Sequence, residues 1–338
     1  MRVRRVSVGV GVIGAGNIGQ DHIRRLSRVV VGSQVVAVSD VDAERARKVA
    51  ETVPGARVHA SGHDLIADPE VDAIVVATWG PSHEEFVLAA IACDKPVFCE
   101  KPLAPTADAC VRIMDAEIAS GKKMVQVGFM RRFDKGYRAM KATLAAGNLG
   151  APLMVHCAHR GPRAPSTMSG EMLITDSAIH ELDLMRWLLG EELTAATVLC
   201  PRPTSSQPEL QSPQLVLLES TSGVLIDVEV FVNCSYGYDI RCELVGDLGT
   251  VALGNGDGVV VRHAGQRAGH VPADWIERFA DAYDAEMRAW IDSVATSRAV
   301  GPSSWDGYAA TAVATACLAS LASGQRAPVQ MQPRPAFY

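Results

Sequence analysis

Three residues of this chain have the types and positions for acid–base chemistry on a hydroxyl group. Lys101 lies in Glu100-Lys101-Pro102, directly after an apolar run. A strand that ends there carries its charged groups to the carboxyl edge of a sheet, where ligands bind in open α/β folds. Pro102 restricts the backbone of Lys101 to extended conformations and so gives its side chain a direction. Asp176 and His180 are four residues apart in an expected helix, so they would share one face.

These side chains suit the oxidation of a secondary alcohol. His180 can accept the hydroxyl proton, Asp176 can hold the imidazole ring, and a cationic Lys101 can stabilise the developing alkoxide. The hydride transfer itself belongs to a nicotinamide cofactor. Structural roles stay open for each residue. Lys101 can be a solvated strand-end lysine, and Asp176 can cap its helix or pair with His180 on a solvated face.

A glycine-rich motif provides a site for that cofactor. Gly14-Ala15-Gly16-Asn17-Ile18-Gly19 follows an expected strand and opens an expected helix, and Asp40 ends the next expected strand. Glycines in this context let the backbone approach a pyrophosphate at the helix N-terminus, and the carboxylate can bind the adenosine ribose hydroxyls. The next residues, Val41 and Asp42, offer no arginine for a 2′-phosphate. The motif therefore predicts NAD rather than NADP, and the alternative is a glycine turn with a structural role alone.

A second loop, Thr78 to His83, follows the fourth expected strand and would pass over the cofactor. Thr78, Trp79 and His83 are therefore candidate cofactor contacts, together with the strand-end pair Glu100 and Lys101. His83 can equally cap or pack the helix that begins near Ser82, and Ser82 is a good N-cap residue.

The alternation of apolar strands and amphipathic helices predicts an α/β protein of two domains. Residues 1–128 are expected to form an NAD-binding Rossmann domain with a doubly wound parallel sheet. Its expected strands are Arg5–Ile13, Gln34–Ser39, Arg57–His59, Val71–Ala77, Pro96–Cys99 and Met124–Gly128. Ala73–Ala77 is apolar on both faces, as buried parallel strands are.

Residues 129–338 are expected to form a substrate-binding and oligomerisation α/β domain with a large, mostly antiparallel open sheet. Its expected strands are Leu153–His159, Leu193–Leu199, Gln214–Glu219, Gly223–Asn233, Ile240–Gly246, Thr250–Leu253 and Gly258–Arg262. The 223–233 strand has one apolar face and one mixed face, which lies against solvent or another subunit. Helices are expected over 175–189, ended by Gly190, and from Asp274 to about Thr296.

Composition narrows the class of protein further. The net charge of −6 argues against a nucleic-acid surface. No stretch approaches the roughly 18 apolar residues of a membrane span, and the start of the chain lacks a signal-peptide cleavage pattern. The eight cysteines include no C-x-x-C pair, which argues against bound zinc and against a disulfide framework. We therefore expect a cytoplasmic protein without a metal.

The glycine motif, Glu100-Lys101-Pro102 and Asp176-x-x-x-His180 together resemble the glucose–fructose oxidoreductase / inositol dehydrogenase (Gfo/Idh/MocA) superfamily. Other blocks make the chain similar to its inositol-oxidising bacterial members, and they extend over essentially the whole sequence. These blocks are Gly11–Arg25, Trp79–His83, Val97–Leu103, Gln126–Asp134, His156–Arg160, Tyr236–Asp239 and Gly301–Tyr308. The resemblance implies a Rossmann domain followed by an open-sheet α/β domain, a homotetramer, and a part in inositol catabolism. It further implies NAD-dependent oxidation of myo-inositol at the 2-hydroxyl to 2-keto-myo-inositol.

The resemblance also implies roles for individual residues. The family's catalytic positions correspond to Lys101, Asp176 and His180, which would also contact the substrate. Further substrate contacts correspond to Arg131, His159, Tyr236 and Tyr238. The chain has Gly161 where the family commonly has asparagine, which bears on the inositol isomer or sugar that is preferred.

Two alternatives stay open. One is an NAD-dependent dehydrogenase of another inositol isomer, another cyclitol or a pyranose sugar. The other is an NAD-binding regulator without catalysis, against which the intact Lys101, Asp176 and His180 argue.

Overall fold

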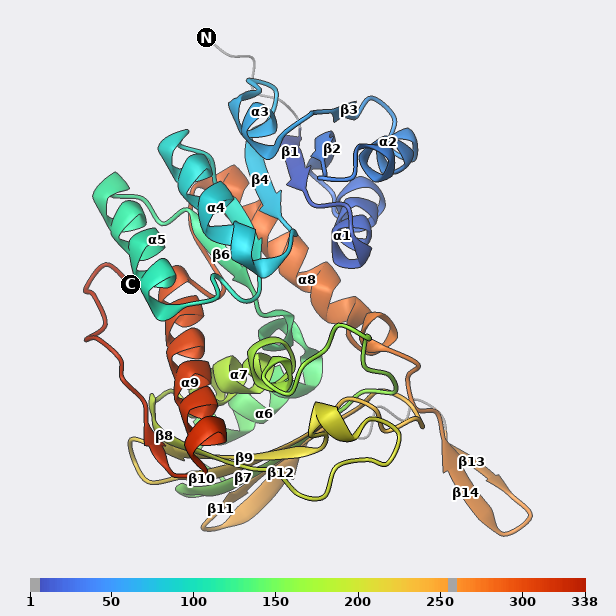
Figure 1. Ribbon diagram of the computed structural model, residues 1–338, viewed down its shortest axis with the longest axis vertical. Helices are drawn as coiled ribbons and strands as arrows, with labels where there is room; N and C mark the ends of the chain where they lie inside the picture. The colour runs from blue at the N-terminus through green and yellow to red at the C-terminus, as the bar shows by residue number, and fades with distance from the viewer. Residues whose placement is uncertain (1–6, 255–259) are drawn as a thin grey trace. The chain divides into compact units, whose positions relative to one another are not determined.

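The computed structural model describes residues 7–254 and 260–338, which form two compact units (Figure 1). One unit contains the described residues through Phe129 together with Tyr283–Thr311 and Pro333–Tyr338. The other contains Met130–Ala282, apart from residues 255–259, and Ala312–Gln332. The predicted α/β fold class is confirmed. The expected division at residue 128 assigned every later residue to the second domain, whereas two later segments of the chain belong to the first unit.

The described part of the first unit is built on a six-stranded sheet in the order β3-β2-β1-β4-β5-β6. Its strands are β1 (Val8–Ile13), β2 (Ser33–Ser39), β3 (Arg57–Val58), β4 (Ala73–Val76), β5 (Val97–Glu100) and β6 (Val125–Gly128). Every neighbouring pair is parallel. All six expected strands are present with slightly different ends, and Arg5 at the start of the first lies outside the described residues.

Helices connect these strands and place loops at one edge of the sheet. They are α1 (Asn17–Arg28), α2 (Ala43–Glu51), α3 (Gly62–Ala67), α4 (His83–Ala92) and α5 (Ala107–Ser120). The strand order reverses between β1 and β4, and the carboxyl ends of β1, β4 and β5 adjoin at this switch point. Ligands of doubly wound folds bind at such a point. The core here includes Phe98 of β5 and Trp290 of α8 (Trp275–Thr296), whose ring centroids are 5.7 Å apart.

The second unit contains a seven-stranded sheet in the order β12-β11-β7-β10-β9-β8-β15. Its strands are β7 (Pro152–Arg160), β8 (Leu193–Leu199), β9 (Gln214–Ser220), β10 (Leu225–Phe231), β11 (Asp239–Gly246), β12 (Gly249–Ala252) and β15 (Ala327–Pro328). Pairing is antiparallel except between β7 and β10. A separate hairpin is formed by β13 (Val260–His263) and β14 (Gln266–Gly269). The expected strand Gly258–Arg262 falls on β13, but residues 258 and 259 lie outside the described part of the chain.

The two faces of β10 differ as its alternating sequence predicted. Val224, Ile226, Val228, Val230 and Val232 are buried. Helices α6 (Lys135–Ala145) and α7 (Ile179–Leu189) lie on one side of the sheet (Figure 1). Exposed apolar side chains on the other face of β10 and its neighbours are Met154, Leu199, Leu217 and Leu225.

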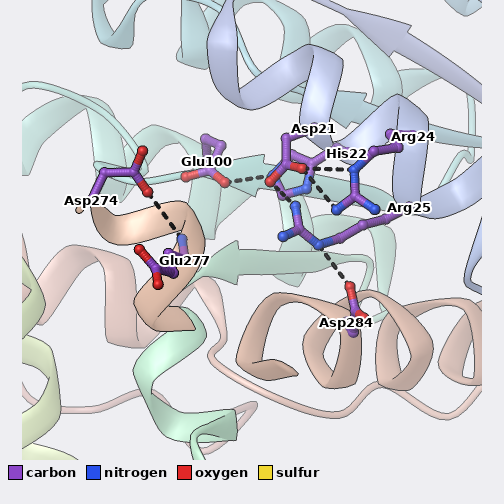
Figure 2. Close-up of polar contacts among 8 residues, drawn as sticks. All are labelled: Asp21, His22, Arg24, Arg25, Glu100, Asp274, Glu277 and Asp284. Carbon is purple, nitrogen blue, oxygen red and sulfur yellow. Dashed lines mark hydrogen bonds and ion pairs between the residues drawn. The ribbon is translucent and has the colours of Figure 1, made fainter. Parts of the chain in front are cut away.

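The expected helices are present, with one correction. The prediction of one α-helix over 175–189 is wrong for its first part, because Leu173–Ala178 is a π-helix that leads into α7. Gly190 ends α7 at φ +76°, as expected for a glycine C-cap. Asp274 accepts the Glu277 N–H at 3.0 Å and so caps α8 (Figure 2). Within the described ranges, no helix combines the length and apolar character needed to cross a membrane.

Candidate active site

The glycine loop has the geometry of a dinucleotide-binding turn. Gly14 has φ +98°, and a Cβ there would lie 2.4 Å from the Ala77 carbonyl oxygen. A Cβ at Gly19 would lie 2.0 Å from the Gly14 oxygen, so α1 packs directly on the turn. Among the described residues, a Cβ at Gly16 would meet nothing within 4 Å, and no side chain caps α1. The N-terminus of α1 and the open space beside Gly16 therefore fit a pyrophosphate.

Asp40, at the carboxyl end of β2, joins this turn to the next helix. Its carboxylate accepts the Ala15 N–H at 2.6 Å and the Asp42 N–H at 2.8 Å. Arg45 of α2 has its Nε 3.9 Å from Asp40 and its Nη2 3.2 Å from Asp42. Arg45 was not predicted as a neighbour of Asp40, because helix geometry returns it to the strand end from one turn further along the chain.

The loop after β4 contains two candidate cofactor contacts, Trp79 and His83, that differ in solvent exposure. Trp79 is 79% exposed, whereas His83 is buried. His83 Nδ1 lies 2.7 Å from the Pro102 oxygen and Nε2 lies 3.1 Å from the Thr78 oxygen. Burial lowers the pKa of His83 although both carbonyl oxygens favour its protonated form. His83 thus holds two loops at the sheet edge, and its contact with cofactor stays a prediction, as do those of Thr78 and Trp79.

Ser82 stands at the N-cap position of α4, as expected, but its side chain does not cap the helix. Its hydroxyl bonds instead to the Thr78 hydroxyl and the Trp79 carbonyl oxygen, both at 2.8 Å. A 3-10 turn over Gly80–Ser82 precedes α4 and turns the serine back toward the strand end.

Lys101 follows the carboxyl end of β5 as predicted, and the Lys101–Pro102 peptide bond is cis. Glu100 is buried, and its Oε1 lies 2.7 Å from His22 Nε2 of α1 (Figure 2). Glu100 Oε2 accepts the Lys101 N–H at 3.1 Å. His22 was not predicted as a functional residue, although it stands only three residues beyond the last glycine of the motif.

Asp176 and His180 lie in the same helical run of the second unit. Asp176 is half-buried in the π-helix and His180 is buried in the first turn of α7. A π-helix has more residues per turn than an α-helix, so the i,i+4 argument for a shared face does not apply unchanged. Lys101 belongs to the other unit, and the joint action of the three residues stays a prediction.

A buried polar network surrounds His159. Arg131 is 1% exposed and forms an ion pair with Glu181. His159 Nδ1 lies 3.1 Å from Glu181 Oε2 and 3.2 Å from Arg131 Nη2, and its Nε2 lies 3.4 Å from the Tyr238 hydroxyl. Burial raises the pKa of Glu181, but Arg131 and His159 lower it more, to about 2. Glu181 was missed, although the charge of a buried Arg131 requires a counterion.

Tyr236 and Gly161 lie near the end of β7. Tyr236 is half exposed, and its hydroxyl donates to Asp239 at 2.6 Å and accepts from Arg160 at 3.2 Å. A Cβ at Gly161 would meet only the backbone of Val232, at 3.8 Å. Packing therefore leaves room for a side chain at Gly161. The substrate contacts predicted for Arg131, His159, Tyr236 and Tyr238 stay predictions.

Comparison with known proteins gives consistent matches over the chain. A model described as "Oxidoreductase family, NAD-binding Rossmann fold" matches residues 8–129, and one described as "Oxidoreductase family, C-terminal alpha/beta domain" matches residues 141–331. "Inositol 2-dehydrogenase 3" of Saccharopolyspora erythraea is 55% identical over 334 residues, 98% of this chain and 98% of that protein. "Inositol 2-dehydrogenase" of Burkholderia vietnamiensis is 51% identical over 331 residues, 97% of this chain and 98% of that protein. The crystal structure of myo-inositol dehydrogenase from Lactobacillus casei, in complex with NAD(H) and myo-inositol, superposes with a TM-score of 0.95 at 42% identity, over 98% of this chain and 99% of that one.

Proposed function

The chain belongs to the Gfo/Idh/MocA oxidoreductase family with its NAD-binding Rossmann fold, and on that premise we propose that it oxidises the 2-hydroxyl of myo-inositol to 2-keto-myo-inositol with NAD. The observation that carries this proposal is the identity above 50%, over almost the full length, with proteins named inositol 2-dehydrogenase. The glycine loop, Asp40 and Lys101 support it, since they lie at the carboxyl edge of one parallel sheet.

The residues present fit the cofactor. The N-terminus of α1 and the space beside Gly16 would hold the pyrophosphate, and Asp40 would bind the adenosine ribose. Thr78 and Trp79 would border it from the loop after β4. When bound, NAD accepts the hydride from the oxidised carbon.

Three side chains would act on the substrate hydroxyl. His180 takes up its proton, Asp176 orients the imidazole, and the Lys101 ammonium stabilises the negative charge that develops on oxygen. The backbone N–H of Lys101 donates to Glu100 Oε2 at 3.1 Å, which fixes the backbone from which the lysine side chain extends. The variants Lys101→Ala and His180→Ala should lower kcat far more than NAD affinity. Near-wild-type turnover in either variant would show that the assigned roles are wrong.

The network around His159 suits a substrate that carries several hydroxyls. Glu181 Oε2 lies beside Nδ1 of His159, and the Tyr238 hydroxyl lies beside its Nε2. Tyr236 adds a second phenol from the same segment. We expect His159, Tyr236 and Tyr238 to bond ring hydroxyls, and Arg131 to act by orienting His159. A site that bonds each hydroxyl rejects analogues that lack one.

The direct test is NADH formation with myo-inositol, scyllo-inositol, D-chiro-inositol and glucose, each with NAD and with NADP. The highest kcat/KM is expected for myo-inositol with NAD. Absence of turnover with every inositol would contradict the proposal.

Gly161 motivates the second candidate, a dehydrogenase of another inositol isomer, another cyclitol or a pyranose. Because the structure leaves room there, Gly161→Asn should fold normally and shift the kcat/KM ratio between isomers. Gly249→Asn is the matched control and should leave that ratio unchanged, because Gly249 starts β12, has no positive φ and has a Cβ position 3.5 Å from the Leu149 side chain. An unchanged ratio in Gly161→Asn would remove this residue from substrate selection.

We also propose a cytoplasmic homotetramer. The exposed apolar residues Met154, Leu199, Leu217 and Leu225 on the outer face of the seven-stranded sheet support a subunit contact there. The eight free cysteines suit a reducing compartment. Light scattering coupled to gel filtration should give the mass of four chains for the wild type and a smaller mass for Leu225→Asp. A monomeric wild type would refute the assembly.

A further inference from the structure

A buried histidine–glutamate pair lies beside Lys101 and takes no part in the proposed reaction. His22 is 0% exposed and Glu100 is 5% exposed. The His22 Nε2 and Glu100 Oε1 atoms are 2.7 Å apart, and Figure 2 shows the two side chains pointing toward one another from α1 and β5. A carboxylate this deeply buried is unstable unless it is hydrogen-bonded. The contact with His22 therefore stabilises the buried carboxylate of Glu100.

The carboxylate of Glu100 has a defined position because three groups surround it. One oxygen faces His22, and the other accepts the backbone N–H of Lys101 at 3.1 Å. On the neighbouring strand β6, Gly128 stands directly opposite Glu100. A Cβ at Gly128 would lie 3.0 to 3.2 Å from the carboxylate atoms, so the glycine provides the space that the carboxylate occupies.

The ring of His22 is itself fixed by its surroundings. Its centroid lies 5.4 Å from that of Phe98, which shares a face of β5 with Glu100, and 5.9 Å from that of Tyr283. Its Nδ1 is buried with no hydrogen-bond partner among the described residues. Nε2 is therefore the ring nitrogen through which His22 bonds the Glu100 carboxylate.

The next turn of α1 is fixed as well. Arg25 forms ion pairs with Asp21 and, at 2.9 Å, with Asp284 (Figure 2). Its guanidinium lies 4.8 Å from the centre of the Tyr283 ring. The helix that carries His22 is thereby tied to the segment of α8 that belongs to the same unit.

We propose that His22 is a positioning residue for Lys101. It holds the Glu100 carboxylate, which holds the Lys101 amide, and this chain of contacts sets the direction in which the lysine leaves β5. Because His22 lies on the helix that opens at the glycine loop, the cofactor loop and the support for the lysine share one rigid element. The inference rests on the catalytic role given to Lys101 under the proposed function.

The first test compares two amide side chains of different length at position 22. In His22→Gln the amide extends as far as Nε2 and can donate to Glu100, whereas the shorter amide of His22→Asn cannot. We expect kcat with myo-inositol to fall about tenfold or more in His22→Asn, with the KM for NAD changed less than about threefold, and to recover largely in His22→Gln. Equal kcat in the two variants would overturn the proposal.

A matched control is available in the same unit. His59 Nε2 also lies 2.9 Å from a largely buried carboxylate, that of Asp68, at a strand that carries none of the proposed catalytic groups. His59→Asn removes the same kind of contact and should leave kcat unchanged. If kcat falls as much in His59→Asn as in His22→Asn, loss of any histidine–carboxylate contact in this unit lowers kcat. That result would overturn the specific role of His22.

A second readout needs neither cofactor nor substrate. Residue-resolved hydrogen exchange of the apo protein follows the Lys101 amide, and Pro102 contributes no amide beside it. Exchange at Lys101 should be about tenfold faster in His22→Asn and near wild type in His22→Gln, with the amides of β1 unchanged in both. Wild-type protection of Lys101 in His22→Asn would overturn the proposal. This measurement stands even where the wild type oxidises no inositol, a result that would refute the proposed function instead.

Discussion

Replacement of Glu181 by glutamine should lower the free energy of unfolding of the second unit by about 3 kcal/mol near neutral pH. Burial raises the pKa of Glu181, yet Arg131 and His159 lower it from 4.5 to about 2. Each unit of pKa corresponds to about 1.4 kcal/mol, which gives the stated magnitude. Glutamine keeps the shape of the side chain, but it replaces one acceptor oxygen with a donor NH2 group and leaves the buried Arg131 without its counter-charge. Loss of one partner from a buried pair costs a similar amount, about 3–5 kcal/mol.

The sign of the pH dependence follows from the same shift. A carboxyl whose folded pKa is lowered contributes stability above its unfolded pKa, and this contribution is lost as pH falls from about 4.5 toward 2. The difference between wild type and Glu181→Gln should therefore be full near pH 7 and narrower by about 1 kcal/mol near pH 4. Denaturant unfolding followed by circular dichroism measures it, and hydrogen exchange of α7 assigns the transition to the second unit.

Glu219→Gln is the control for this measurement. Glu219 also accepts two hydrogen bonds from an arginine, Arg326, at 2.6 and 2.7 Å, but at the surface of the same unit. Exposed pairs contribute about 0–1 kcal/mol, so Glu219→Gln should change little. The reasoning is refuted if Glu181→Gln is as stable as this control, or if its stability difference from wild type does not depend on pH.

Three further predictions concern the first unit. Gly16→Ala should weaken NAD binding without changing the thermal unfolding of the apo protein. In Gly19→Ala the Cβ would overlap backbone, so this variant should lower both the NAD affinity and the thermal stability of the apo protein. NADH fluorescence titration measures the affinity, and thermal melts measure the stability. Because burial lowers the pKa of His83 below 6.5, the unfolded chain binds more protons, and stability should fall as pH drops through about 6.5. Denaturant unfolding between about pH 5 and 7.5 should show a flatter profile for His83→Gln. Glu117→Gln should lower the free energy of unfolding by about 2 kcal/mol or more in the same assay, since the buried carboxylate accepts from two backbone N–H groups and two hydroxyls.

Each of these has a contrary result. Equal apo stability of Gly16→Ala and Gly19→Ala would contradict the packing assigned to the loop. An unchanged pH profile in His83→Gln would mean that this ring titrates normally. A Glu117→Gln protein as stable as wild type would show that the carboxylate bonds add nothing to stability.

The Rossmann part of the fold was predictable because its evidence is local. Strands such as Ala73–Val76 are apolar on both faces, and the glycine motif requires a strand before it and a helix after it. The same holds for the alternating faces of β10. These patterns depend on near neighbours in the chain, and they placed Gly14, Asp40 and Lys101 at the sheet edge correctly.

The features that were missed depend on contacts between distant residues. The importance of Glu181 follows from burial of Arg131, 50 positions earlier, and that of His22 from Glu100, 78 positions later. The helix α9 (Ser304–Ser323) was not predicted because its apolar residues surround the axis and form no stripe. The π-helix before α7 has no signature of its own in the sequence.

The return of a late segment to the first unit has a consequence for how the chain matures on the ribosome. Trp290 and Ile291 belong to the same core as β1, β2, β4 and β5, yet they are synthesised more than 150 positions after that sheet is complete. Until they emerge, the nascent Rossmann sheet exposes the apolar surface that they later cover. Contacts of such long sequence separation slow folding and leave partly folded chains prone to association. We therefore expect the cofactor-binding unit to finish folding late, after Trp290 and Ile291 have been synthesised, rather than as the first step of folding.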